Sequence, residues 1–175
     1  MKHVIRTFVL AAAVALTASS AFAQATIHGD LVKEWAGQKD LLVKMASAMP
    51  DDKIGFKPTP AQRSFGEHIL HIAQVNTALI GAMGGKTPAP AINMKAATKA
   101  DQIKAMSDSF DYGAKVIAEF DNTTIQGTVQ QPFGMGPATR ARVMFFLVAH
   151  TQDTYGQMAV YLRLNGVTPP ASQRP

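Results

Sequence analysis

The sequence predicts an all-α protein, a four-helix bundle with long connections between its helices. Four amphipathic segments carry apolar residues at intervals of three and four, and connections that contain proline and glycine separate them. Two or three of these connections exceed about a dozen residues, which a four-helix bundle accommodates readily. The 175 residues, 47% of them hydrophobic, suffice for one domain with a core and are too few for two comfortable ones.

The first two helices are defined by their capping residues. The first is expected to begin after Asp30, a suitable N-cap, and to end at the segment MPDDKIGFKPTPAQR. The second opens with Ser64-Phe65-Gly66-Glu67, a capping box in which a hydroxyl and a carboxylate satisfy opposing backbone N–H groups. Their apolar stripes comprise Leu31, Trp35, Leu42, Met45 and Met49, and then Phe65, Ile69, Ile72, Leu79 and Met83.

The second half of the chain repeats this arrangement. The third helix is expected to start around Thr98, and it has the most regular pattern of the chain, with Ile103, Met106, Phe110, Gly113, Ile117 and Phe120. Residues 123–136 combine β-branched residues with glycines, which predicts a small hairpin or an ordered loop. The fourth helix is expected from about Pro137 to Asn165, with Gly166 as its C′ residue and Pro169-Pro170 preventing continuation.

Residues 1–23 have the pattern of a secretory signal peptide. Basic residues precede the apolar run TFVLAAAVALTA, and alanines at positions 21 and 23 form a cleavage site before Gln24. A transmembrane anchor is the alternative, but the run is shorter than the ~20 residues that span a bilayer. We therefore expect residues 24–175 to form the mature domain, exported to a periplasm or secreted, with no transmembrane anchor after cleavage.

Composition excludes several function classes. The formal charge of +5 falls to +3 without Lys2 and Arg6, because 15 basic residues then face 12 acidic ones, and the basic residues are scattered. This distribution does not favour a nucleic-acid partner. The chain has no cysteine, so any metal must be held by nitrogen and oxygen ligands. The sequence contains no phosphate-binding glycine loop, nucleophile elbow or dinucleotide fingerprint either.

Three histidines are the candidate functional residues. His68 and His71 lie about 60° apart around the second helix, and spacing alone does not choose between them. On the fourth helix, His150 and Thr154 share one face, and Asp153 lies just to its side. Neutral imidazoles from two facing helices can bind a divalent ion. The simpler interpretation is a histidine with one hydrogen-bond partner that stays neutral.

Several segments resemble one protein family. The stretches RSFGEHILHIAQVN and AHTQDTYGQMAVYLRLNGVTPPAS, together with the loop KPTPAQRSFGE, are similar to corresponding segments of the DinB-like, or DinB/YfiT-like, metalloenzymes. The likeness extends over the mature chain and is strongest to exported members with the Pro-Pro ending. It implies a four-helix bundle.

The resemblance also implies a metal site with one departure. Family members hold a divalent metal with one histidine of the second helix and a His-x-x-x-His pair of the fourth. The first two positions correspond to His71 and His150, and the third is occupied by Thr154. Asp153, Thr154 and His68 are the candidates for the third ligand, and Zn²⁺ or Ni²⁺ is the expected ion.

Two functions follow from this comparison, and the sequence leaves both open. The first is a metal-dependent enzyme of hydrolase-like or transferase-like type, with a degenerate histidine site and a small-molecule ligand of unknown identity. Known transferases of the family use cytosolic thiols, which an exported chain does not meet. The alternative is a non-catalytic exported binding or interaction protein that kept the bundle and lost the metal. A homodimer is a third, weaker alternative, because the nine methionines are suited to adaptable apolar surfaces, but methionines at helical spacing more often belong to an ordinary core.

Overall fold

Four long helices form the domain, as the sequence predicts. The computed structural model describes residues 26–173, so the proposed signal peptide lies outside the described residues. The helices are α2 (Ile27–Ala48), α3 (Phe65–Ala82), α4 (Lys99–Ile117) and α5 (Arg140–Leu164). Short 3-10 turns occupy Asp51–Lys53, Thr124–Gln126 and Pro170–Ser172. None of the helices within residues 26–173 combines the length and apolar character needed to cross a membrane.

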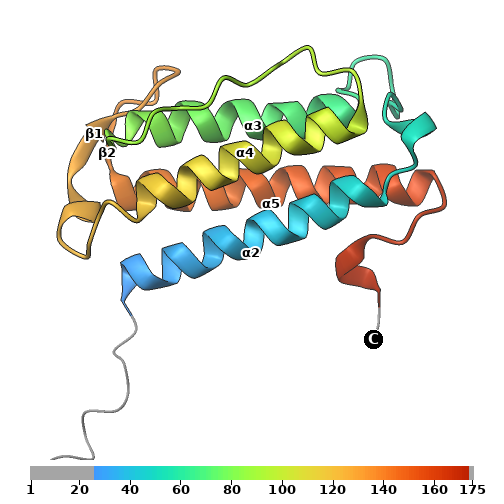
Figure 1. Cartoon of the computed structure of the whole chain (residues 1–175). Helices are drawn as coiled ribbons and strands as arrows, with labels where there is room; N and C mark the ends of the chain where they lie inside the picture. Colours follow the sequence, from blue (N-terminus) through green and yellow to red (C-terminus); the bar gives the residue numbers. More distant parts are fainter. Residues whose placement is uncertain (1–25, 174–175) are drawn as a thin grey trace, which may run out of the picture.

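The order of the helices around the bundle differs from a simple up-down arrangement. Both α2 and α3 pack against α4 and α5, so α2 and α3 lie diagonally opposite each other. The helix α3 runs parallel to α4, since Gly66 lies beside Gln102 and Asn76 bonds to Ser109. The connection between α3 and α4 must therefore return along the whole bundle, and it crosses the top of the view in Figure 1.

The core is built by the predicted apolar stripes. The stripe residues of the first two helices are buried, and they include Trp35 and Phe65. Trp35 packs against Phe110 with ring centroids 4.6 Å apart, and its indole N–H donates to the Phe110 carbonyl at 2.9 Å. Gly113 permits this contact, because a Cβ at that position would lie 2.5 Å from the Trp35 ring. On α4 the stripe extends further than the helix, which ends before the half-buried Phe120.

Two of the expected helix starts are wrong. The N-cap of α2 is Thr26, whose hydroxyl accepts from the Gly29 N–H, and Asp30 lies inside the first turn. The N-cap of α5 is Thr139, because Pro137–Thr139 is strand β2, which pairs with β1 (Thr128–Gln130) in an antiparallel hairpin. Of the two alternatives left open for residues 123–136, a small hairpin or an ordered loop, the structure shows the hairpin, and it extends into the segment assigned to the fourth helix.

The remaining predicted ends are confirmed. Thr98 caps α4 through its hydroxyl, and Ser64 caps α3 in a complete capping box. Gly166 has a φ of +74° after the last turn of α5. Its N–H donates to the Arg163 carbonyl and the Val167 N–H donates to the Leu162 carbonyl, which is the Schellman pattern that a glycine at C′ favours.

Candidate functional site

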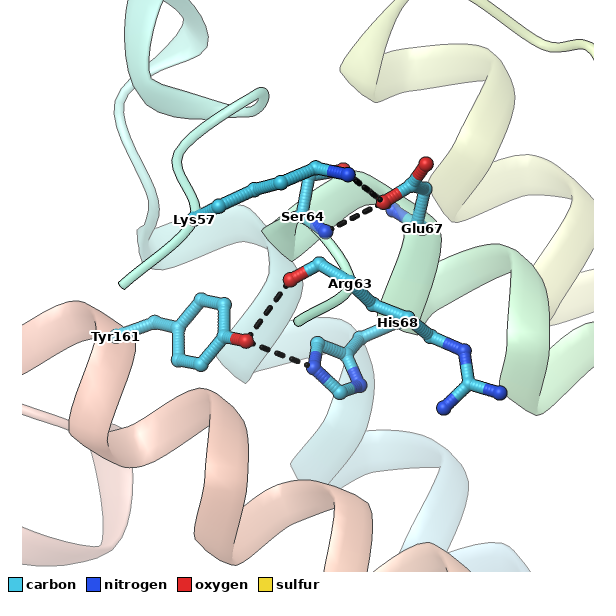
Figure 2. A network of polar contacts seen from close by, with 6 residues as sticks. All are labelled: Lys57, Arg63, Ser64, Glu67, His68 and Tyr161. Carbon is cyan, nitrogen blue, oxygen red and sulfur yellow. Dashed lines mark hydrogen bonds and ion pairs between the residues drawn. The ribbon is translucent and has the colours of Figure 1, made fainter. Parts of the chain in front are cut away.

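The capping box at the start of α3 fixes the helix that carries two of the histidines. The Ser64 hydroxyl accepts from the Glu67 N–H at 3.2 Å, and the Glu67 carboxylate accepts from the Ser64 N–H at 2.5 Å. The same carboxylate lies 3.0 Å from the Lys57 ammonium. These contacts, the Ser64 hydrogen bond first, lower the pKa of Glu67 to about 2. The Lys57–Glu67 ion pair and the capping box together hold the preceding loop against the first turn of α3, as Figure 2 shows.

His71 and His150 meet between α3 and α5. Their Nε2 atoms are 3.1 Å apart, and their ring centroids are separated by 5.0 Å. Phe146 stacks against His150 one turn earlier on α5, with ring centroids 6.2 Å apart. The Nδ1 atom of His150 is buried and has no hydrogen-bond partner among the described residues. The structure thus brings together the two residues that the resemblance assigned as metal ligands.

All three histidines of the site favour the neutral form. Burial, followed by the charges of Arg63, His150 and His68, lowers the pKa of His71 to about 4. Burial also lowers the pKa of His150, partly offset by the charge of Asp153, and it lowers the pKa of His68. At neutral pH each imidazole therefore has a free nitrogen lone pair, which is the form that binds a metal ion.

Two of the three candidates for a third ligand, Thr154 and Asp153, make hydrogen bonds within α5 and not with the histidine pair. The Thr154 hydroxyl is buried and donates to the His150 carbonyl at 2.9 Å, one turn back in α5. The Asp153 side chain is exposed and accepts from the Gln157 amide at 2.8 Å. In the part of the chain that the structure describes, no three His, Asp or Glu side chains are grouped to hold a metal ion.

His68, the remaining candidate, belongs to a separate contact. Its ring is buried, and its Nε2 lies 3.3 Å from the Tyr161 hydroxyl, which donates to the Arg63 carbonyl at 2.8 Å. Figure 2 shows Tyr161 between these two groups. The structure therefore separates two histidines that helical spacing alone left equivalent: His71 faces His150, and His68 faces Tyr161.

Two cavities open beside these histidines. One of about 420 Å³ is lined by His71, Gln74 and Lys57, and the other, of about 400 Å³, by His68, Gln157 and Tyr161. Residues 61–63 line both cavities. Sequence reasoning missed Arg63 because it is one basic residue among many, and its position directly before the capping box is the signal that could have indicated it.

A second polar cluster lies beside His150 and was also missed. The buried side-chain oxygen of Gln38 on α2 accepts from the Gln152 amide at 2.8 Å and lies 3.2 Å from the Thr151 hydroxyl. Its spacing from Trp35 and Leu42 places Gln38 on the buried face of α2, and this position is the sequence signal that could have indicated it. These contacts fix α2 against the turn of α5 that carries His150.

The fold and this histidine pair describe a helical-bundle protein with a polar site between two of its helices. The sequence profile of the DinB family matches residues 21–175, so the chain belongs to the DinB family. No protein with a curated description matches the chain.

Three solved structures show the same fold at low sequence identity. A DinB-like protein from Bacillus cereus is 18% identical, with a TM-score of 0.65 over 80% of this chain and 93% of that one. A DinB-like protein from Bacillus subtilis is 14% identical, with a TM-score of 0.64 over 83% of this chain and 99% of that one. YfiT from Bacillus subtilis, described as a probable metal-dependent hydrolase with an unusual four-helix bundle topology, is 10% identical, with a TM-score of 0.64 over 79% and 87% of the two chains.

Proposed function

We propose that this protein is a hydrolase-like enzyme that depends on a divalent metal ion, Zn²⁺ or Ni²⁺, held by His71 and His150. The observation that carries the proposal is the approach of the two Nε2 atoms to 3.1 Å, from helices that are distant in sequence. The chain also shares its fold with YfiT, which is described as a probable metal-dependent hydrolase, and this likeness supports the proposal of a metal-dependent activity. Shared fold alone does not define an activity, so the histidine pair carries the argument.

The residues present fit two positions of a metal site. Two imidazole nitrogens that bind one tetrahedral Zn²⁺ at about 2.0–2.1 Å lie about 3.3 Å apart. The 3.1 Å between these Nε2 atoms is close to that separation. Ligating histidines usually donate their other ring N–H to a fixed acceptor. His150 has no such partner among the described residues, so we expect weaker binding than in a complete three-histidine site.

The chain would contribute binding and orientation to the reaction. A bound divalent ion supplies a polarised carbonyl or a water of lowered pKa. His71 and His150 would hold it, and Phe146 stacks on His150 and restricts the orientation of its ring. Asp153 places a negative charge close to His150, which favours a cation in this position. Because the described residues supply no third ligand of this type, further positions remain for water and substrate.

Metal content is the direct test of this proposal. Protein purified without an affinity tag and exposed in turn to Zn²⁺, Ni²⁺ and Mn²⁺ should retain about one ion per chain by elemental analysis. His71→Ala and His150→Ala should each lower the affinity at least about tenfold, because one of two ligands is lost. His28→Ala is the matched control, since His28 lies outside the site and contacts the Ile117 carbonyl. If none of the three ions is retained in a stoichiometric amount, the proposal is wrong.

The alternative of a non-catalytic binding protein predicts a different response at position 154. We expect Thr154→His to raise the metal affinity at least about tenfold over that of the natural protein, by adding the missing imidazole. Thr154→Val, which removes only the hydroxyl, should leave the affinity unchanged. If the natural protein shows no metal binding and Thr154→His creates it, the binding-protein alternative replaces our proposal.

We also propose that the protein is exported after removal of residues 1–23. The charged start, apolar run and Ala-x-Ala site of the sequence support this proposal. Intact mass measurement of the protein from an expressing bacterium should give a mature chain that begins at Gln24. A mass that includes residue 1 would contradict removal of the segment.

A further inference from the structure

We propose that Arg63 binds the carboxylate of a small monocarboxylic substrate at the mouth of the site formed by His71 and His150. This inference rests on the proposed function, because it assigns the charged end of the substrate of that same site.

Arg63 lies between the two cavities beside the histidines. Arg63 lines both the cavity of about 420 Å³ that His71 also lines and the cavity of about 400 Å³ that His68 also lines. Its charge lowers the pKa of all three site histidines, so the guanidinium is within electrostatic range of the whole cluster. A ligand bound to Arg63 in the first of these cavities is thus placed beside His71.

The backbone of Arg63 is fixed before any ligand binds. Tyr161 of α5 donates a hydrogen bond to its carbonyl at 2.8 Å, and the next residue, Ser64, is locked in the capping box with Glu67. Figure 2 shows this anchored segment, with the Arg63 side chain extending away from Tyr161. An anchored residue loses less freedom on binding than one in a free loop, which favours affinity.

The guanidinium itself has no partner. Among the described residues, Arg63 makes no ion pair or side-chain hydrogen bond, and it is exposed. The nearby Lys57 is already paired with Glu67 at 3.0 Å. One unpaired cation matches one negative charge, and the planar fork of a guanidinium matches the two oxygens of a carboxylate.

The test uses N-acetylglycine, a small monocarboxylate, and its methyl ester, which has nearly the same shape without the charge. Binding is followed by the Nε–Hε signals of arginine in ¹⁵N-labelled protein at constant ionic strength. N-acetylglycine should shift the Arg63 signal saturably at concentrations up to about 10 mM, and the methyl ester should not. Arg63→Gln should weaken binding about tenfold, and Arg63→Lys should weaken it less. Because these variants lack the Arg63 side-chain signal, their binding is measured from the backbone amide signals of neighbouring residues.

Arg142→Gln is the matched control for the loss of one exposed positive charge. Arg142 also lacks a side-chain partner among the described residues, and it lies at the start of α5. This variant should bind N-acetylglycine as the natural protein does. Equal binding of acid and ester, no saturable shift, or an unchanged affinity in Arg63→Gln would overturn the inference.

The titration is performed both on chelator-treated protein and on protein loaded with Zn²⁺, so that two failures are distinguished. Binding that depends on Arg63 in the chelator-treated protein supports the anion site even where no metal is retained, in which case only the proposed metal dependence fails. Retained metal together with binding that ignores Arg63 has the opposite meaning: the metal proposal stands and the carboxylate site is wrong.

Discussion

Tyr161 is the single residue on which two parts of the site depend. Its one hydroxyl proton is donated to the Arg63 carbonyl, so the hydrogen bond to His68 must be donated by the His68 Nε2. This fixes the tautomer of the neutral His68, and its Nδ1 then carries a lone pair that has no partner among the described residues. Burial raises the pKa of Tyr161, which keeps the phenol protonated as a donor.

Removal of this hydroxyl should destabilise the fold measurably. Tyr161→Phe leaves the Arg63 carbonyl and the His68 Nε2 without their partner, so we expect a loss of about 1–3 kcal/mol in the free energy of unfolding by urea. Tyr155→Phe is the matched control, because the Tyr155 hydroxyl only accepts a long contact of 3.4 Å from the exposed Ala171 N–H. Equal losses in the two variants would contradict the role assigned to Tyr161.

The depressed histidine pKa values make stability depend on pH in a defined direction. The pKa of His71 falls from 6.5 to about 4 on folding, so the unfolded chain binds more protons between these values. The stability contributed by neutral His71 is complete above pH 6.5 and is lost progressively as the pH falls toward 4. Urea unfolding of metal-free protein from about pH 7 to about pH 5 should show this loss.

His71→Gln tests the source of that dependence. The variant should lose less stability than the natural protein over the same interval, and the remaining slope should come from His68 and His150, whose pKa values are also lowered. Glu67 does not interfere, because its contribution is lost only as the pH falls from 4.5 toward about 2. An unchanged slope in His71→Gln would show that His71 is not protonated on unfolding in this range.

At the scale of elements, two glycines inside helices should respond oppositely to alanine. A Cβ at Gly113 of α4 would lie 2.5 Å from the Trp35 ring, whereas nothing lies within 4 Å of the corresponding position at Gly156 of α5. Gly113→Ala should therefore cost about 1–3 kcal/mol through displaced packing. Gly156→Ala should stabilise by about 0.5–1 kcal/mol, because alanine favours the helix. Thermal unfolding of both variants measures the difference.

The ends of the elements show where sequence reasoning succeeds. The Ser64 capping box and the glycine at 166 are local patterns with one solution each, and both are confirmed. The predicted cap of α2, Asp30, is a suitable residue type, but the structure places the cap four residues earlier at Thr26, whose hydroxyl is equally suited to that role. The start of α5 depended on the pairing of Thr128–Gln130 with Pro137–Thr139, which is a tertiary contact and not a property of the helix.

The same distinction applies to the site. Helical spacing placed His150 on the inner face of α5, and the structure brings it to His71. Spacing could not tell which of His68 and His71 lies opposite His150, because the two side chains differ by only about 60° around α3. That choice depends on Tyr161, which lies 93 residues from His68 in sequence and occupies its Nε2. The anchoring of Arg63 likewise depends on a long-range contact, the hydrogen bond from Tyr161 to its carbonyl, in addition to the capping box that follows it in sequence.

At the scale of the whole molecule, most of the methionines belong to the core. Six of the nine are fully buried, so they do not supply the adaptable surface on which the homodimer prediction depends; they are Met45, Met49, Met83, Met106, Met144 and Met158.

An exposed apolar surface lies instead at the start of α2 and on α5. Phe145 is exposed on α5 and lines an apolar cavity of about 310 Å³ with Ile27 and Val148. A homodimer stays a prediction, and sedimentation velocity of residues 24–175 at two concentrations checks it.

The helix order also sets when the histidine pair is assembled. His71 and His150 are 79 residues apart, and His150 lies on the last long helix of the described chain. During translation the pair does not exist until α5 has been synthesised and has docked against α3. The two-histidine site, if it binds metal as proposed, therefore acquires its ion in the compartment where folding finishes. The metals available there, and not those at the ribosome, decide which ion an exported chain contains.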